Sequence, residues 1–225
     1  MRKTLPLLLT LLLLAAGCRK EGFVPYSGQE MAQVLSGTLT TDEGVKLVVD
    51  GNSGNYDVNT SRRVLVRYQT TSLGTDGSYT IDLQELWETT VANPFPASDP
   101  VGVVTDDPVR IDEAWFSGGY LNLRVAFPAV DPALHDFPMS YAIDGKKAVL
   151  RLYHDARENV PSNAELKQAF LCFPLKDVTS AYPAPSDGSK TWVIPVLLQW
   201  RWYDREEDTQ TVILYEKEGS YRTSR

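Results

Sequence analysis

The sequence has 225 residues, of which 43% are hydrophobic and 23% are charged, a composition typical of a folded globular protein and not of a disordered or collagen-like chain. Its formal net charge of −7 argues against a nucleic-acid partner, because phosphate binding favours a basic surface. Two cysteines and two histidines are too few for most zinc, haem and iron–sulfur sites, so we expect no cofactor. The 14 prolines, 15 glycines and many β-branched and aromatic residues predict an all-β fold.

Residues 1–17 are predicted to be a signal peptide. Arg2 and Lys3 precede an apolar stretch at residues 5–16, which is shorter than the ~20 residues that a spanning helix needs. The leader ends in small residues directly before Cys18, and this ending resembles the lipobox of bacterial lipoproteins. The resemblance implies that Cys18 is lipidated and becomes the first residue of the mature chain. The alternative is an ordinary secretory signal with an incidental cysteine.

Lipidation of Cys18 predicts a protein that is attached to a membrane by its N-terminal lipid. Residue 19 is arginine, so the chain lacks the aspartate that retains many lipoproteins in the inner membrane. We therefore expect anchoring in the outer membrane, on either the periplasmic face or the cell surface. Lipidation also leaves Cys172 without a disulfide partner. Because Cys172 stands among apolar residues, we predict a buried hydrophobic residue and not a reactive thiol.

The first part of the mature chain is predicted to be a flexible tether followed by a small barrel. Residues 18–34 show little periodicity, which is typical of a tether. Across residues 35–93 short strands alternate with turns, including those at residues 50–52 and 75–78. Four or five short strands in this length suit a small OB-like β-barrel.

One apolar face is clear within the predicted barrel. Tyr79, Ile81 and Leu83 alternate with polar residues, as in a strand that has one buried face. We expect Trp87 to continue the same face.

A proline-rich segment separates the barrel from the second half of the chain. Residues 94–108 contain prolines that cannot join a strand ladder, so we place the linker between domains there. Residues 109–218 are predicted to form an immunoglobulin-like β-sandwich, residues 219–225 a tail, and residues 163–169 a short helix. The expected strands are at residues 120–127, 139–143, 148–154, 191–203 and 209–215, with turns at residues 144–146 and 204–208.

The run WFSGGYLN at residues 115–122, preceded by DPVRI at residues 107–111, resembles the start of the C-terminal β-sandwich in the NigD-like lipoproteins. DEG at residues 42–44 and LRLYH at residues 150–154 also agree with that family, although Tyr153 departs from its pattern. The resemblance implies an outer-membrane lipoprotein of anaerobic Gram-negative bacteria, with an OB-like module before a β-sandwich. The family's name derives from a bacteriocin gene cluster, which implies an immunity or accessory role and supplies no catalytic residues.

Three residues are candidates for a binding surface. Trp115 and Tyr120 flank the predicted turn at residues 117–119, where they either meet a ligand or pack across the hairpin. His154 beside Asp155 could belong to a hydrolytic triad, but no Gly-x-Ser-x-Gly elbow accompanies the pair. A histidine that ends a strand and caps a loop is the favoured interpretation of His154.

Two other groups of residues have a structural and a functional interpretation. Trp200 and Trp202 share one strand face, but that face is otherwise an apolar row, so burial is favoured over a platform for a sugar. The acidic residues near the linker match no calcium-loop spacing, and a solvated loop is favoured over a calcium site. These acidic residues are Asp99, Asp106, Asp107 and Asp112.

These features predict a protein that is not an enzyme. We expect a lipoprotein whose barrel-to-sandwich surface and open strand edges bind an envelope protein, a peptide or a bacteriocin. A surface module that binds glycans is the alternative, motivated by five tryptophans and 11 tyrosines. That alternative requires at least two aromatic side chains exposed on one face.

Overall fold

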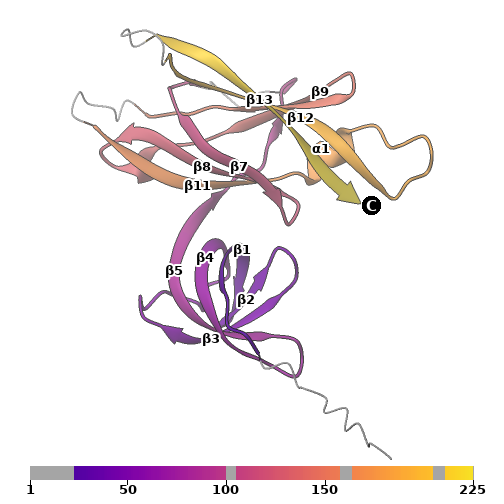
Figure 1. Ribbon diagram of the computed structural model, residues 1–225. Coiled ribbons are helices and arrows are strands. Elements are labelled where there is room, and N and C mark those ends of the chain that lie inside the picture. Colours follow the sequence, from indigo (N-terminus) through magenta and orange to yellow (C-terminus); the bar gives the residue numbers. More distant parts are fainter. Residues whose placement is uncertain (1–22, 100–104, 158–163, 205–210, 225) are drawn as a thin grey trace, which may run out of the picture.

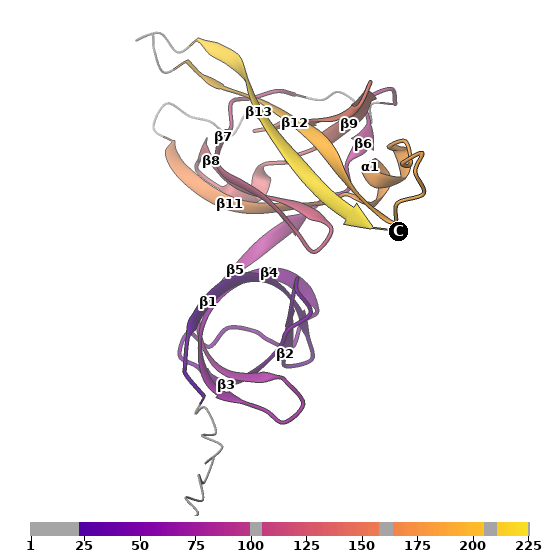
Figure 2. The ribbon, with the colours of Figure 1, turned by 45° about the vertical axis from the view of Figure 1, so that its right-hand side comes forward.

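Residues 23–99, 105–157, 164–204 and 211–224 are described by a computed structural model, in which they form a barrel and a sandwich that are joined end to end (Figure 1). Figure 2 shows the barrel as a ring beneath the two layers of the sandwich. No helix among the described residues is long and apolar enough to cross a membrane. The all-β fold predicted from the sequence is confirmed.

Five strands form the barrel. They lie in the order β3-β2-β1-β4-β5, and β3 pairs with β5 in parallel to close the ring. The strands are β1 (Ser27–Leu35), β2 (Thr38–Thr41), β3 (Lys46–Asn52), β4 (Arg62–Leu73) and β5 (Tyr79–Val91). Alternate side chains fill the inside of this ring, as expected of a small barrel. The buried core consists of Ala32, Val34, Leu39, Leu47, Val64, Val66, Tyr68, Ile81 and Leu83.

Two predicted boundaries in the barrel are wrong. The strand β1 begins at Ser27, inside the predicted tether at residues 18–34, and pairs with β4 along its length. Its outward-facing polar residues hide the apolar alternation in the sequence. The turn predicted at residues 50–52 is also part of a strand, because β3 continues through a bulge beside Gly51.

A second bulge changes the direction of side chains in β5. The pairing between β4 and β5 shifts by one residue at Gln84. Before the bulge, Ile81 and Leu83 point into the barrel core; after it, Leu86 packs against that core and Trp87 packs outside it. The prediction that Trp87 continues the apolar face is therefore wrong, because one extra residue moves all later side chains to the opposite face.

Two mixed sheets pack face to face in the sandwich. One contains β7 (Arg110–Ser117), β8 (Tyr120–Ala129), β11 (Glu165–Pro174) and the end of β5. The other contains β6 (Phe95–Pro96), β9 (Met139–Asp144), β10 (Lys147–Leu152), β12 (Thr191–Tyr203) and β13 (Val212–Ser224). The parallel pair β5–β11 in the first sheet and the pairs β10–β12 and β6–β9 in the second distinguish these sheets from the antiparallel sheets of immunoglobulin domains.

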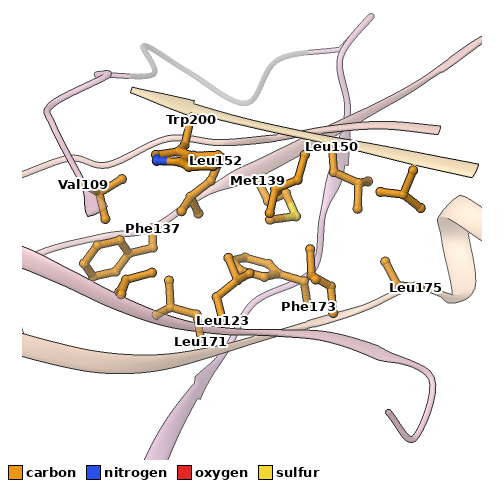
Figure 3. Close-up of a cluster of buried hydrophobic side chains, with 14 of the residues drawn as sticks. Val109, Leu123, Phe137, Met139, Leu150, Leu152, Leu171, Phe173, Leu175 and Trp200 are labelled. Carbon is orange, nitrogen blue, oxygen red and sulfur yellow. The ribbon is translucent and has the colours of Figure 1, made fainter. Parts of the chain in front are cut away.

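The sandwich core lies between these two sheets (Figure 3). The predicted apolar face of β8 is confirmed, since its four alternate apolar residues are fully buried. Side chains from the opposite sheet, including Met139, Leu150 and Leu152, meet them in the core. The four β8 residues are Leu121, Leu123, Val125 and Phe127.

Three further predictions in the second half need correction. Residues 163–169 were predicted to be helical, but β11 begins at Glu165 and pairs with β8, so tertiary pairing overrides the helical propensity of this stretch. Among the described residues, the helices are η1 (Pro132–Leu134) and α1 (Lys176–Ala181). The predicted tail at residues 219–225 lies in β13 as far as Ser224, and the predicted linker at residues 94–108 includes β6. Most of the charged turn predicted at residues 204–208 lies outside the described residues.

The strand β5 connects the two domains. Its first part pairs with β4 and β3 in the barrel, and its last residues pair with β11 in the sandwich, Thr89 to Val91 lying opposite Phe170 to Cys172. One sheet therefore runs from the barrel into the sandwich. Both domains contribute side chains around the point where β5 passes from the barrel into the sandwich, and the candidate site lies there.

Candidate functional site

A buried ion pair between Arg63 and Asp42 of the barrel lies at the junction between the domains. Arg63 of β4 donates two hydrogen bonds to Asp42, from Nη1 to Oδ1 at 2.7 Å and from Nη2 to Oδ2 at 2.6 Å. The two side chains are only 5% and 11% exposed. Burial alone would lower the pKa of Arg63, but the hydrogen bond and charge of Asp42 raise it. In this buried position each side chain depends on the other for compensation.

The sandwich completes this polar cluster through its β7–β8 hairpin. Ser117 Oγ donates a hydrogen bond of 2.5 Å to Asp42 Oδ2, and Asn122 Nδ2 donates one of 2.9 Å to Ser117 Oγ. Arg63 Nη2 also donates to Asn122 Oδ1 at 3.1 Å. Four polar side chains from two domains are thus hydrogen-bonded to one another in a region where unpaired groups would be costly.

The glycine of this hairpin allows the close approach. Gly118 has a positive φ of 56°, and a Cβ built on it would lie 2.4 Å from the carboxylate of Asp42. A larger residue would therefore separate the hairpin from the barrel as well as strain the turn. Ser117, Gly118 and Asn122 belong to the run WFSGGYLN, which here connects the domains.

An apolar group, which we call the junction cluster, surrounds the polar one. Tyr120 lies under the guanidinium of Arg63, with 4.0 Å from the carbon Cζ to the ring centroid. Cys172 is a free and fully buried cysteine, and burial raises the pKa of its thiol, as expected of an inert core residue. The junction cluster consists of the buried Met31, Leu65 and Cys172 with the half-buried Trp87, Trp115, Tyr120 and Phe170.

A cleft of about 630 Å³ opens beside the junction cluster, on the side where β4 and β5 of the barrel meet β8 and β11 of the sandwich. Trp87 and Phe170 form its apolar floor, with ring centroids 6.0 Å apart. We call it the junction cleft. Its lining is formed by Gln29, Leu65, Arg67, Leu86, Trp87, Glu88, Thr90, Arg124, Gln168, Ala169 and Phe170.

The backbone of β11 has an open edge at this cleft. Residues 165–174 pair with β8 on one side, but β5 pairs on the other side only from Phe170 to Cys172. Within the described ranges, residues 165–169 therefore have a strand partner on one side only. Exposed Leu166 and Gln168 lie on the same face of this strand as Phe170. An open edge beside an apolar floor can accept another strand.

The charged side chains of the cleft already have partners. Arg124 Nη2 lies 2.7 Å from Glu113 Oε1, Arg67 pairs with Glu85, and Glu88 pairs with Arg62. The cleft thus presents paired charges, amides and aromatic rings, and no excess of one charge that would select a strongly charged ligand.

The three predicted binding residues do not form one surface. Trp115 and Tyr120 do come together, but as half-buried members of the junction cluster, so they connect the domains. His154 is 1% exposed and lies inside the sandwich. It is therefore not part of a binding surface. Trp87 and Phe170, which the sequence does not indicate as binding residues, line the cleft instead, and the bulge in β5 that turns Trp87 out of the barrel core leaves no clear sequence signal.

His154 belongs to a buried histidine pair. Its Nε2 is 2.8 Å from Nδ1 of His135, and its Nδ1 is 3.0 Å from the carbonyl oxygen of Pro108. These contacts assign the Nδ1–H tautomer to His154, with Nε2 accepting from His135. The carboxylate of Asp155 instead accepts from the backbone N–H of Arg157. The suggested triad fragment of His154 and Asp155 is therefore not assembled.

Two of the acidic candidate residues have structural partners. Asp106 accepts from Arg151 at 2.6 Å, and Asp107 accepts from the backbone N–H of Ala156 at 2.9 Å. No group of three or more metal-binding side chains occurs among the residues that the structure describes. In the tryptophan row of β12, Trp200 is buried and Trp202 packs against the sandwich core, so the predicted burial is confirmed. As predicted, this row is not an open platform.

The architecture and junction define a class of protein: an all-β chain in which a five-stranded barrel is docked through a buried ion pair onto a β-sandwich. Residues 97–188 match the family model of the NigD-like C-terminal beta sandwich domain. The sandwich is a NigD-like domain, and the resemblance seen in the sequence is confirmed. None of the curated proteins matches the chain.

Solved structures with the same fold come from Bacteroides and related bacteria. A NigD-like immunity protein from Bacteroides caccae is 23% identical with a TM-score of 0.66, over 88% of this chain and 98% of that chain. A protein from Bacteroides fragilis described as a candidate lipoprotein is 16% identical, with a TM-score of 0.59 and coverage of 90% and 100%. A candidate toxin-related protein from Parabacteroides distasonis is 19% identical, with a TM-score of 0.55 and coverage of 86% and 93%.

Proposed function

We propose that this protein is a lipid-anchored protein of the bacterial outer membrane that binds an extended segment of another envelope protein or peptide. In this proposal it catalyses no reaction, and the bound segment lies in the junction cleft. The observation that carries the proposal is the open edge of β11 next to Trp87 and Phe170. The anchor is Cys18, which lies outside the described residues.

Strand addition explains how such a cleft would gain both affinity and selectivity. An incoming segment would hydrogen-bond to the free backbone groups of residues 165–169, an interaction that depends little on its sequence. One of its side chains would cover Trp87 and Phe170, and this apolar contact would select among segments. The docked domains hold the two parts of the site in place before binding, which lowers the ordering cost of association.

The names of similar structures favour a role related to bacteriocins. One neighbour is an immunity protein and another a candidate toxin-related protein. A peptide bacteriocin, or the envelope protein that it targets, is therefore the partner class that we favour. Anchoring in the outer membrane would place the junction cleft in the cell envelope, where it could meet such a partner.

The glycan-binding alternative receives less support from the geometry. All five tryptophans are buried or half-buried, whereas a sugar platform requires aromatic faces that are open to solvent. Trp87 reaches the junction cleft but is packed against Phe170. We therefore favour a peptide over a glycan as the ligand.

A photoreactive amino acid placed at Gln168 tests this proposal in living cells. Gln168 is exposed and lines the cleft, so we expect irradiation to give an adduct of defined mass that contains peptide from a second protein. The additional change Trp87→Ala should lower the adduct yield about tenfold, since it removes an aromatic anchor. The matched control is Ser186, an exposed residue outside the cleft. Equal adducts from both positions, or none from Gln168, would contradict the proposal.

A further inference from the structure

Aromatic side chains gather at the end of the barrel that points away from the sandwich. Phe23 contacts Tyr79 with ring centroids 6.3 Å apart, and Tyr26 contacts Tyr79 at 5.5 Å. Tyr79 begins β5 and lies opposite Leu73, the last residue of β4. Figures 1 and 2 both place the start of the described chain at this end of the barrel. We call Phe23, Val24, Tyr26, Leu73 and Tyr79 the barrel tip.

The barrel tip exposes apolar surface. Val24 is 78% exposed, Leu73 51% and Tyr26 40%. Single exposed apolar residues are normal on a soluble protein, but a group of them at one end marks an interaction surface. Tyrosine is also enriched where proteins meet the boundary between water and lipid, because its ring is apolar and its hydroxyl group is polar.

The sequence sets a limit on how far this tip can lie from the anchor. Phe23 follows Cys18 by five positions, and a fully extended chain spans at most ~3.6 Å per residue, or about 18 Å in total. If Cys18 carries the lipid, the tip must lie within that distance of the membrane surface.

We propose that the barrel tip lies against the lipid headgroups of the membrane that holds Cys18. The barrel then stands on the membrane, and the sandwich and the junction cleft face away from it. This inference rests on the proposed lipid anchor and adds an orientation and a second contact to it. Because the contact is apolar, it needs no anionic lipid.

Fluorescence quenching in phosphatidylcholine vesicles tests this orientation. The lipidated full-length chain would carry one environment-sensitive label, at Leu73→Cys or at the control position Leu214→Cys in β13. Both positions are exposed, whereas Cys172 is buried and would not react. With spin-labelled headgroups in the vesicles, we expect the label at position 73 to lose about half of its fluorescence or more, and the label at position 214 to change little.

A substitution that preserves the fold makes this test specific. Val24→Glu places a charge on the most exposed residue of the tip and should reduce quenching at position 73 about twofold. Val193→Glu in the sandwich, at a position that is 48% exposed, should leave it unchanged. Equal quenching at positions 73 and 214, in protein that is bound to vesicles through its lipid, would overturn the orientation alone. Wild-type protein that lacks the acyl mass on Cys18 would overturn the anchor and the orientation together.

Discussion

Replacing Arg63 by methionine is expected to lower the free energy of unfolding by about 3–5 kcal/mol, because it leaves the buried carboxylate of Asp42 without its cation. Asp42 would keep the hydrogen bond from Ser117 but lose two charge-assisted bonds from Arg63. Asn122 would also lose the bond from Arg63 to its Oδ1. Urea unfolding followed by circular dichroism measures the change.

The neighbouring Arg62 is the matched control for this prediction. Arg62 pairs with Asp57 and Glu88 at the surface, so Arg62→Met should cost no more than about 1 kcal/mol. The double change Arg63→Met with Asp42→Leu should recover part of the loss, since no charge then remains buried alone. Equal losses in the free energy of unfolding for Arg62→Met and Arg63→Met would show that the junction ion pair stabilises the fold no more than an exposed ion pair does.

The histidine pair is expected to make the protein less stable as the pH falls below about 6.5. Burial lowers the pKa of His154 in the folded protein, and the neighbouring His135 acts in the same direction. The unfolded chain therefore takes up a proton at a higher pH than the folded chain does. Stability from this group is fully present above the unfolded pKa and is lost as the pH falls towards the folded one.

Measuring the free energy of unfolding between pH 7.5 and 5 tests this prediction. The slope due to one such group can reach about 1.4 kcal/mol per pH unit. Asp107, Asp155 and the carbonyl group of Pro108 oppose the lowering, so the slope reports the balance of these effects. His154→Gln should be less stable at pH 7.5 and should show a flatter dependence on pH. An unchanged slope in that variant would assign the dependence to other groups.

The sequence predicts the strands well where hydrophobic alternation is regular. Alternation in β8 and β12 correctly indicates which side chains enter the sandwich core, because one face of each strand meets that core. It fails in β11, where residues 165–169 have helical propensity but pair with β8 as a strand. Local propensity is weaker than the pairing that the rest of the fold imposes.

The candidate site is harder to predict, because it depends on the relative position of the two domains. The run WFSGGYLN carries the resemblance to NigD-like proteins, but its role at the junction depends on Asp42 and Arg63, which are far away in sequence. Likewise, Trp87 reaches the cleft only because of the bulge in β5. A bulge adds a single unpaired residue to one strand, and this leaves no clear pattern in the amino-acid sequence.

The central claim is that the junction holds the barrel and the sandwich in one arrangement and so shapes the cleft. Electron-spin distance measurement between labels at Val48→Cys in the barrel and Leu214→Cys in the sandwich tests it most directly, in protein that also carries Cys18→Ser. Both labelled positions are exposed, and buried Cys172 stays unlabelled. We expect one narrow distance distribution in this protein and a broader one after Arg63→Met. An equally broad distribution with Arg63 intact would show that the domains move independently, and would contradict a preformed cleft.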